Sequence, residues 1–192
     1  MSERKRGSEL KEVIYKATIE ILESEGYRAV NFQKVAKHAH TARGVLYRYW
    51  DDVETLIYEA GRAYLKKNSE GHNMAINRPF NNGRLRLDLL EMLHFFINNA
   101  RLLPKNFMAF IFFEDTQGRH LMDDRTNNLV IMERILVRAQ ERGEVSADIA
   151  LSAKLVPFEL LRQRMMVEGV EQSDEALETL VDEILLPLYL KR

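Results

Sequence analysis

Apolar residues recur every three or four positions along most of the chain, which is the period of a helix with one buried face. The first such stripe predicts a helix over residues 8–25, with Ser8 as its N-cap and Gly26 as the residue that stops it. No alternation with a period of two persists anywhere along the chain, so no strand is predicted. We therefore expect an all-α protein of about nine helices.

Two short helices are predicted after the first one. One begins behind Asn31, a good N-cap, and the next has Thr41 as its N-cap. Three short helices, the second and third joined by about three residues, form a helix-turn-helix, whose third helix fits the major groove of DNA. The apolar side chains expected to brace this unit are Leu10, Ile14, Ala17, Ile21, Phe32, Val35, Ala36, Leu46 and Trp50.

The rest of the chain is also predicted to be helical. Asp51 and Asp52 begin a linking helix over 51–67, and residues 68–83 have the composition of a loop. Ser173 is typical of a helix start, and Pro157 and Pro187 should kink or end the helices that contain them. The later helices are expected near 84–101, 104–116, 119–142, 148–168 and 174–190. The expected domains are a helix-turn-helix over 1–50, extending into 51–67, and a larger helical domain over 68–192.

The charge is unevenly distributed along the chain. Residues 1–50 hold ten Lys and Arg and six acids, a net charge of +4, whereas the other 142 residues sum to −5. A basic N-terminal segment favours contact with phosphates, although chance clustering gives the same pattern. The chain has no cysteine, no apolar run of membrane-spanning length and no signal-peptide pattern. We therefore expect a cytoplasmic protein without disulfides that is not inserted in a membrane.

The segment from Gly26 to Leu56 resembles the N-terminal domain of the TetR family of transcriptional regulators. The most specific match is Leu46-Tyr47-Arg48-Tyr49-Trp50, ten residues after Val35-Ala36, and the resemblance covers roughly residues 8–62. The departures are His40 for the family's turn Gly, Ala42 for Ser, Trp50 for Phe, and Val53, beside two aspartates, for Lys. The turn position needs a left-handed backbone, which His adopts more readily than most residues, whereas the missing Lys removes a phosphate anchor.

The resemblance implies a DNA-contacting set of ten residues. By position, Gln33 and Arg43 match base-reading residues, and Arg43 suits a bidentate contact with guanine. Gly44 lets the backbone approach the groove, and Val45 suits contact with a thymine methyl group. The full set is Asn31, Gln33, Lys37, Thr41, Arg43, Gly44, Val45, Tyr47, Arg48 and Tyr49, in which Asn31, Tyr47 and Tyr49 match phosphate contacts and Lys37 and Arg48 are phosphate neighbours.

The C-terminal part is expected to dimerise and to bind an effector. The resemblance implies that the last two long helices pair with their copies, although the same apolar stripes suit packing within one chain. The expected interface is Leu151, Leu155, Phe158, Leu161, Met165, Leu177, Leu180, Val181, Ile184 and Leu188. A segment rich in Phe and Met suits an apolar effector cavity or an ordinary core. The expected lining residues are Met92, Phe95, Phe96, Phe107, Phe110, Phe113, Met122 and Arg162.

No motif of an enzyme is present. The chain has no P-loop, no G-x-S-x-G and no H-E-x-x-H, and His38 and His40 straddle a turn, which makes a poor metal pair. We therefore expect no catalysis, no metal and no cofactor. The expected function is a homodimeric regulator, a repressor that binds a palindromic operator in double-stranded DNA until a small, largely apolar effector releases it. Two alternatives are a helical ligand-binding or interaction protein with a degenerate DNA-binding domain, and a small helical enzyme.

Overall fold

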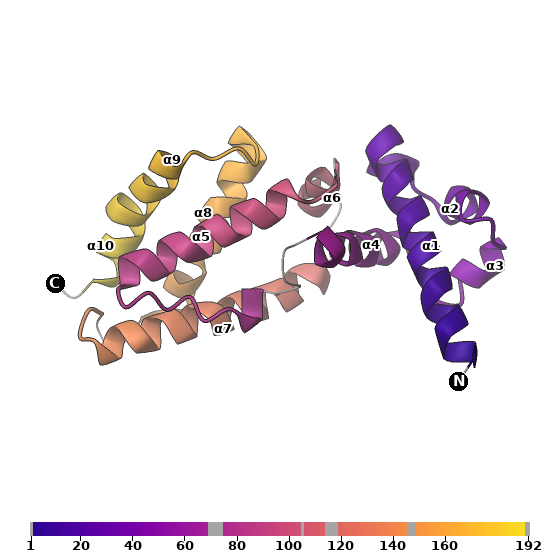
Figure 1. Cartoon of the computed structure of the whole chain (residues 1–192). Helices are drawn as coiled ribbons and strands as arrows, with labels where there is room; N and C mark the ends of the chain where they lie inside the picture. Colours follow the sequence, from indigo (N-terminus) through magenta and orange to yellow (C-terminus); the bar gives the residue numbers. More distant parts are fainter. Residues whose placement is uncertain (1, 69–74, 105, 114–118, 146–148, 191–192) are drawn as a thin grey trace. The chain divides into compact units, whose positions relative to one another are not determined.

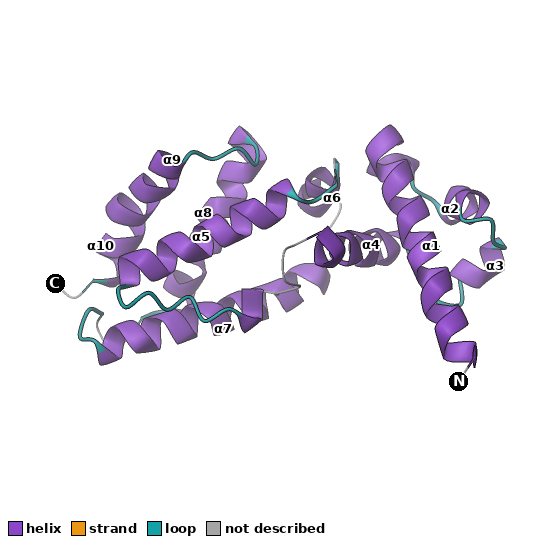
Figure 2. Ribbon diagram, viewed as in Figure 1, coloured by secondary structure: helices purple, strands orange, loops and turns teal. Residues whose placement is uncertain are grey.

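The computed structural model describes residues 2–68, 75–104, 106–113, 119–145 and 149–190. Within these ranges the chain is helical and contains no strand, apart from one isolated bridge between Val145 and Leu190 (Figure 2). This confirms the all-α prediction. The described helices include none that is both long enough and apolar enough to cross a membrane.

The chain forms two compact units. The first comprises residues 1–72 and 102–117, and the second comprises residues 73–101 and 118–192. The first unit's helices are α1 (Ser2–Glu25), η1 (Tyr27–Ala29), α2 (Phe32–His38), α3 (Arg43–Leu46), α4 (Val53–Asn68) and α6 (Phe107–Phe113). The second unit's helices are η3 (Ala75–Asn77), α5 (Leu85–Arg101), α7 (Arg119–Glu141), α8 (Leu151–Glu168), α9 (Asp174–Thr179), η4 (Leu180–Leu185) and α10 (Leu186–Tyr189).

The first helix is longer than predicted. It begins at Ser2, so Ser8 lies inside α1 and is not its N-cap. The six residues before Ser8 include Glu, Arg and Lys, which are good helix formers, and they extend the helix through the basic run Arg4-Lys5-Arg6. Its predicted end is confirmed, because Gly26 follows Glu25 with φ 85° and donates its N–H to the carbonyl of Leu22.

The first unit is held by one buried cluster. All the bracing residues predicted from the sequence lie in it, with Leu10 packed at its edge and the others buried, and α2 and α3 lie beside α1 in Figure 1. Phe107 and Phe110 of α6 join the same cluster, and the Asn106 side chain donates to the carbonyl of Leu22 at 3.1 Å. Residues 102–117 therefore belong to the first unit, although the sequence analysis grouped them with 68–192.

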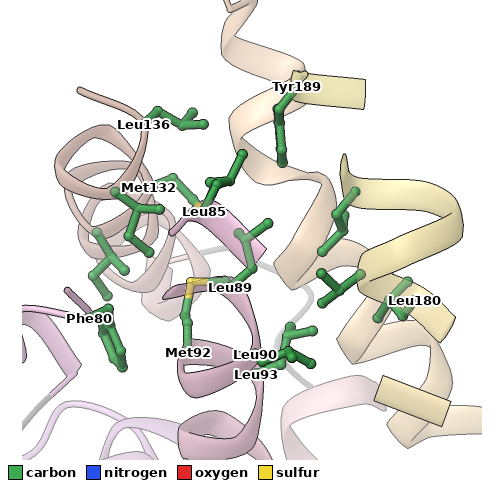
Figure 3. Close-up of a cluster of buried hydrophobic side chains, with 14 of the residues drawn as sticks. Phe80, Leu85, Leu89, Leu90, Met92, Leu93, Met132, Leu136, Leu180 and Tyr189 are labelled. Carbon is green, nitrogen blue, oxygen red and sulfur yellow. The ribbon is translucent and has the colours of Figure 1, made fainter. Parts of the chain in front are cut away.

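The second unit is built around α5. Its apolar face includes Leu85, Leu89 and Met92, which lie among side chains of α7 and of the C-terminal helices (Figure 3). The start of α5 is fixed by a distant acid, since Glu144 accepts the backbone N–H of Leu85 at 2.8 Å. A carboxylate at that position satisfies a free N–H and complements the helix dipole.

The two prolines do not end their helices in the expected way. Pro157 lies inside α8, which continues to Glu168. Because Pro157 has no N–H, the carbonyl of Ala153 loses its helical partner, and the buried Tyr189 hydroxyl replaces it at 2.7 Å. Burial raises the pKa of Tyr189, which keeps its hydroxyl a donor. Pro187 lies in the first turn of α10, directly after the π-helical turn η4.

Gly61 of α4 should be intolerant of any side chain. A Cβ built there would lie 2.1 Å from Cε2 of the buried Phe107 ring, within the first unit. We predict that Gly61→Ala lowers the free energy of unfolding by about 1–3 kcal/mol, the usual cost of overpacking, as measured by urea denaturation. Adding Phe107→Leu should recover part of the loss. Unchanged stability of Gly61→Ala would contradict the close packing of α4 against Phe107.

Candidate nucleic-acid interface

The turn between α2 and α3 closes around His40. The N–H of Thr41 donates to the carbonyl of Ala36 at 2.9 Å, and the N–H of His40 donates to that of Lys37 at 3.3 Å. This is the Schellman pair of bonds, which requires a left-handed residue, and His40 has φ 49° as predicted. At the end of α7, Gly143 has φ 77° and closes the same pair of bonds. His40 therefore performs the turn that glycine performs elsewhere in the chain.

Thr41 does not cap α3, as the sequence analysis expected. The N-cap of α3 is Ala42, which has no side-chain acceptor, and the helix begins at Arg43. The backbone of Thr41 completes the end of α2 instead, so this residue lies one position too early to cap the next helix. The N-cap prediction for α2 is confirmed, since Asn31 accepts the N–H of Lys34 at 2.9 Å. Asp52, one of the two acids predicted to begin the next helix, accepts the N–H of Thr55 in the first turn of α4 at 2.7 Å.

Most of the predicted DNA-contacting residues are exposed, on two short helices and the turn that follows. Phe32, Leu46 and Trp50, which hold these helices, are buried. The exposed members are Asn31, Gln33, Lys37, Arg43, Gly44, Tyr47, Arg48 and Tyr49, whereas Thr41 and Val45 are half-buried. Among the described residues, no ion pair engages Lys37 or Arg48, whereas Lys34 pairs with Glu25. The structure thus presents most of the predicted set to solvent on one compact scaffold.

Arg43 and Tyr47 contact each other. They lie one helical turn apart, and Nη2 of Arg43 donates a hydrogen bond to the Tyr47 hydroxyl. The guanidinium also lies over the Tyr47 ring, 5.1 Å from its centroid. The Tyr47 ring also contacts the Phe32 ring, with 4.8 Å between the centroids and an interplanar angle of 83°. A row of three side chains therefore runs from the core to the exposed guanidinium.

A carboxylate that the sequence analysis missed holds this scaffold. Oε2 of Glu59 on α4 accepts the indole N–H of Trp50 at 2.8 Å and the hydroxyl of Tyr15 on α1 at 2.7 Å. Burial and this hydrogen bond raise the pKa of Tyr15. The signal that points to such a partner is Trp50 itself, because a buried indole N–H needs an acceptor.

The side of the scaffold near Tyr49 is also held by α1. The ammonium of Lys11 lies 5.4 Å from the centroids of both the Tyr49 and the Trp50 rings. Cation–π contacts of this kind restrain both the ring and the Lys side chain. Tyr49 therefore stands beside a positive charge of α1, which favours an anionic partner.

Residues 14–60 match the family model described as bacterial regulatory proteins of the tetR family. These residues include the second half of α1, the whole of α2 and α3, and half of α4. This segment is that of a TetR-family protein. The chain is 25% identical, over 95% of each chain, to the DNA-binding transcriptional repressor TetR of Mycobacteroides abscessus. It is also 27% identical to the transcriptional repressor KstR of Rhodococcus jostii, over 74% of this chain and 65% of that one.

Solved structures of other regulators share the fold of this chain. A TetR-family regulator from Marinobacter aquaeolei aligns with a TM-score of 0.57 and 18% identity, over 98% of this chain and all of that one. The regulator FadR of Bacillus subtilis, solved in complex with stearoyl-CoA, aligns with a TM-score of 0.62 and 18% identity, over 92% and 96% of the chains. The TetR-family fold thus extends over both units of this chain.

The residues predicted to line an effector cavity are divided between the two units. Met92 is buried in the second unit, where Phe95 and Phe96 pack partly buried against its core, and Arg162 is half-buried on α8. Phe107 and Phe110 lie in the core of the first unit. The side chains of Phe113 and Met122 lie outside the described part of the chain. Effector binding by these residues stays a prediction.

The residues predicted to form the dimer interface differ in burial. The exposed ones are Leu151, at 61%, Ile184, at 42%, and Leu188, at 43%, while Met165 is half-buried. The buried ones are Leu155, Phe158, Leu161, Leu177, Leu180 and Val181, and all of them except Leu155 belong to the buried cluster of the second unit. The core of the second unit therefore uses five of the ten predicted side chains, and the dimer interface stays a prediction.

A substitution at Gly44 should affect DNA binding without lowering the stability of the fold. No atom lies within 4 Å of a Cβ built at this position, so Gly44→Ala should leave stability unchanged or raise it by up to ~1 kcal/mol through helix propensity. If the backbone of α3 approaches DNA closely at Gly44, the methyl group should weaken DNA binding by about tenfold. Fluorescence anisotropy with labelled operator measures the affinity, and urea denaturation provides the control. Unchanged affinity would show that the backbone does not approach DNA at this position.

Proposed function

We propose that the chain is a transcriptional repressor that binds a palindromic operator as a homodimer and leaves it when a small, largely apolar molecule binds. The observation that carries this proposal is the exposed set on α2, α3 and the following turn, supported by a buried core and a closed left-handed turn. The match of residues 14–60 to the tetR family model supports the same conclusion, as do the two relatives named as repressors.

Base reading is assigned to α2 and α3. Arg43 is exposed at the first position of α3, where a guanidinium suits the two acceptors on the major-groove edge of guanine. Gln33 is exposed on α2, and its amide suits adenine. Lys37, Arg48 and Tyr49 surround these residues with groups that bind phosphate and fix the position of the unit on the duplex. Since the proposed partner is DNA, we place the action of the protein in the cytoplasm.

Dimerisation is assigned to the exposed apolar side chains of the C-terminal helices. Leu151 begins α8, and Ile184 and Leu188 lie four residues apart, on one face of η4 and α10. Met166 and Val167 near the end of α8 are also exposed, at 55% and 67%. Exposed large apolar side chains on these C-terminal elements favour a protein partner, and a second copy would supply the two-fold symmetry of a palindrome.

Effector binding is assigned to the second unit. A row of rings runs from Phe80 through Phe95 and Phe96 to Phe158, with centroids 5.2–5.8 Å apart. The two central rings are half-buried, and the Arg78 guanidinium lies 5.0 Å from the centroid of Phe95. Arg78 is also paired with Glu91 at 3.0 Å, so these aromatic walls suit a largely apolar ligand. The structure of FadR with stearoyl-CoA supports a ligand of this kind within the same fold.

Selection from a random pool of double-stranded DNA at physiological salt tests the reader. The wild-type chain should enrich a palindrome, and Arg43→Ala should lose the preference for one base in each half-site, at a cost of about 1–3 kcal/mol per base. Enrichment is measured by sequencing the retained DNA. If the wild type enriches no sequence and retention disappears with modest salt, the alternative applies: a helical ligand-binding protein whose DNA-binding domain is degenerate.

Leu188→Asp tests the proposed dimer surface. A carboxylate buried at an apolar interface without a partner is costly, so the dimer dissociation constant should rise by at least about tenfold. Sedimentation equilibrium measures that constant. Leu87→Asp on α5 is the matched control, because Leu87 is equally exposed, at 42%, and lies outside the proposed surface. Equal effects of the two substitutions would overturn this assignment.

A further inference from the structure

We propose that Tyr47 is a positioning residue for base recognition, which orients the Arg43 guanidinium and so sets the preference for guanine. This inference rests on the proposed function and deepens it. By position in the family pattern, Tyr47 matches a phosphate contact. Its hydroxyl in this structure accepts a hydrogen bond from Nη2 of Arg43 instead, and its ring lies beneath the same guanidinium.

The orientation of the Arg43 side chain depends on a buried residue of the first unit. Phe32 is 5% exposed, and its position is fixed by the buried cluster of the first unit. Its perpendicular contact with the Tyr47 ring restrains that ring, although Tyr47 is 49% exposed. Tyr47 in turn restrains Arg43 at two points, the hydroxyl and the face of the ring. An exposed guanidinium is thereby tied to the core through two aromatic rings.

Such a tie affects specificity because of the geometry of guanine recognition. A bidentate contact needs two N–H groups of the planar guanidinium to point together at O6 and N7. An unrestrained Arg side chain loses rotamer freedom when it adopts that orientation, and a restrained one loses less. The guanidinium retains further N–H donors beyond the one given to Tyr47, enough for both acceptors. A direct phosphate contact would instead strengthen binding to every sequence alike.

Tyr47→Phe tests the proposal, because it removes the hydroxyl and keeps the ring against Phe32. The two probes are the operator selected by the wild-type chain and the same operator with the Arg43-dependent guanine replaced. The ratio of the two affinities should fall by about fivefold in Tyr47→Phe, the value of one ordinary hydrogen bond. The slope of affinity against salt should stay unchanged, because no phosphate contact is lost. In an Arg43→Ala background, Tyr47→Phe should have no further effect on the ratio.

Tyr27→Phe is the matched control, since the Tyr27 ring also lies beneath a guanidinium, that of Arg28 at 5.6 Å, and Tyr27 is outside the proposed DNA-contacting set. It should leave the affinity ratio unchanged. The proposal is overturned if Tyr47→Phe weakens both probes equally, or if it lowers the ratio as much without Arg43 as with it. Failure of the wild-type chain to select any operator would instead overturn the proposed function, so the two failures are distinguishable.

Discussion

The arrangement of the first unit depends on one carboxylate that serves two donors. Oε2 of Glu59, on α4, accepts hydrogen bonds from Tyr15, on α1, and from Trp50, which lies between α3 and α4. Burial of an indole N–H without an acceptor is costly, and so is burial of a carboxylate without donors. Because the Glu59 carboxylate satisfies both donors, the three segments have one preferred arrangement. The apolar cluster supplies the stability, whereas this polar contact selects the geometry.

The same principle operates in the second unit. Pro157 leaves the carbonyl of Ala153 without its helical donor, and Tyr189 supplies one from the far end of the C-terminal segment. Asp88 is fully buried on α5, and it accepts an N–H from Asn82 and a hydrogen bond from Arg142 at 3.3 Å. In each case a backbone or carboxylate group that cannot stay unpaired is satisfied by a residue distant in the sequence. These contacts place helices whose apolar faces alone would tolerate other alignments.

Features of the structure that depend on local rules could be predicted from the sequence. Asn31 and Ser173 cap the helices that follow them, and His40 adopts the left-handed conformation that its turn requires. Local signals failed where the outcome depends on a neighbouring segment. Thr41 has the chemistry of an N-cap, but the turn assigns its backbone to the preceding helix. The partner of Ala153 and the membership of α6 in the first unit could not be predicted, because both depend on contacts between residues far apart in the chain.

The candidate site also combines features that local sequence predicts with features that depend on distant contacts. The identity of its exposed residues came from a sequence pattern, but the tie between Arg43 and Tyr47 requires the position of Phe32, which only the packed core determines.

The C-terminal stripes show why burial within a chain and burial against a partner look alike in a sequence. A helix that packs against its own chain on one side and against a partner on the other has more apolar positions than either contact alone covers. In this chain Leu180, Val181 and Leu185 turn inward, whereas Ile184 and Leu188 stay exposed on the same segment. The π-helical turn over Leu180–Leu185 changes the angular spacing of these residues, so a count based on the α-helical period cannot separate the two groups. The surface left for a partner is therefore defined by what the core of the second unit does not cover.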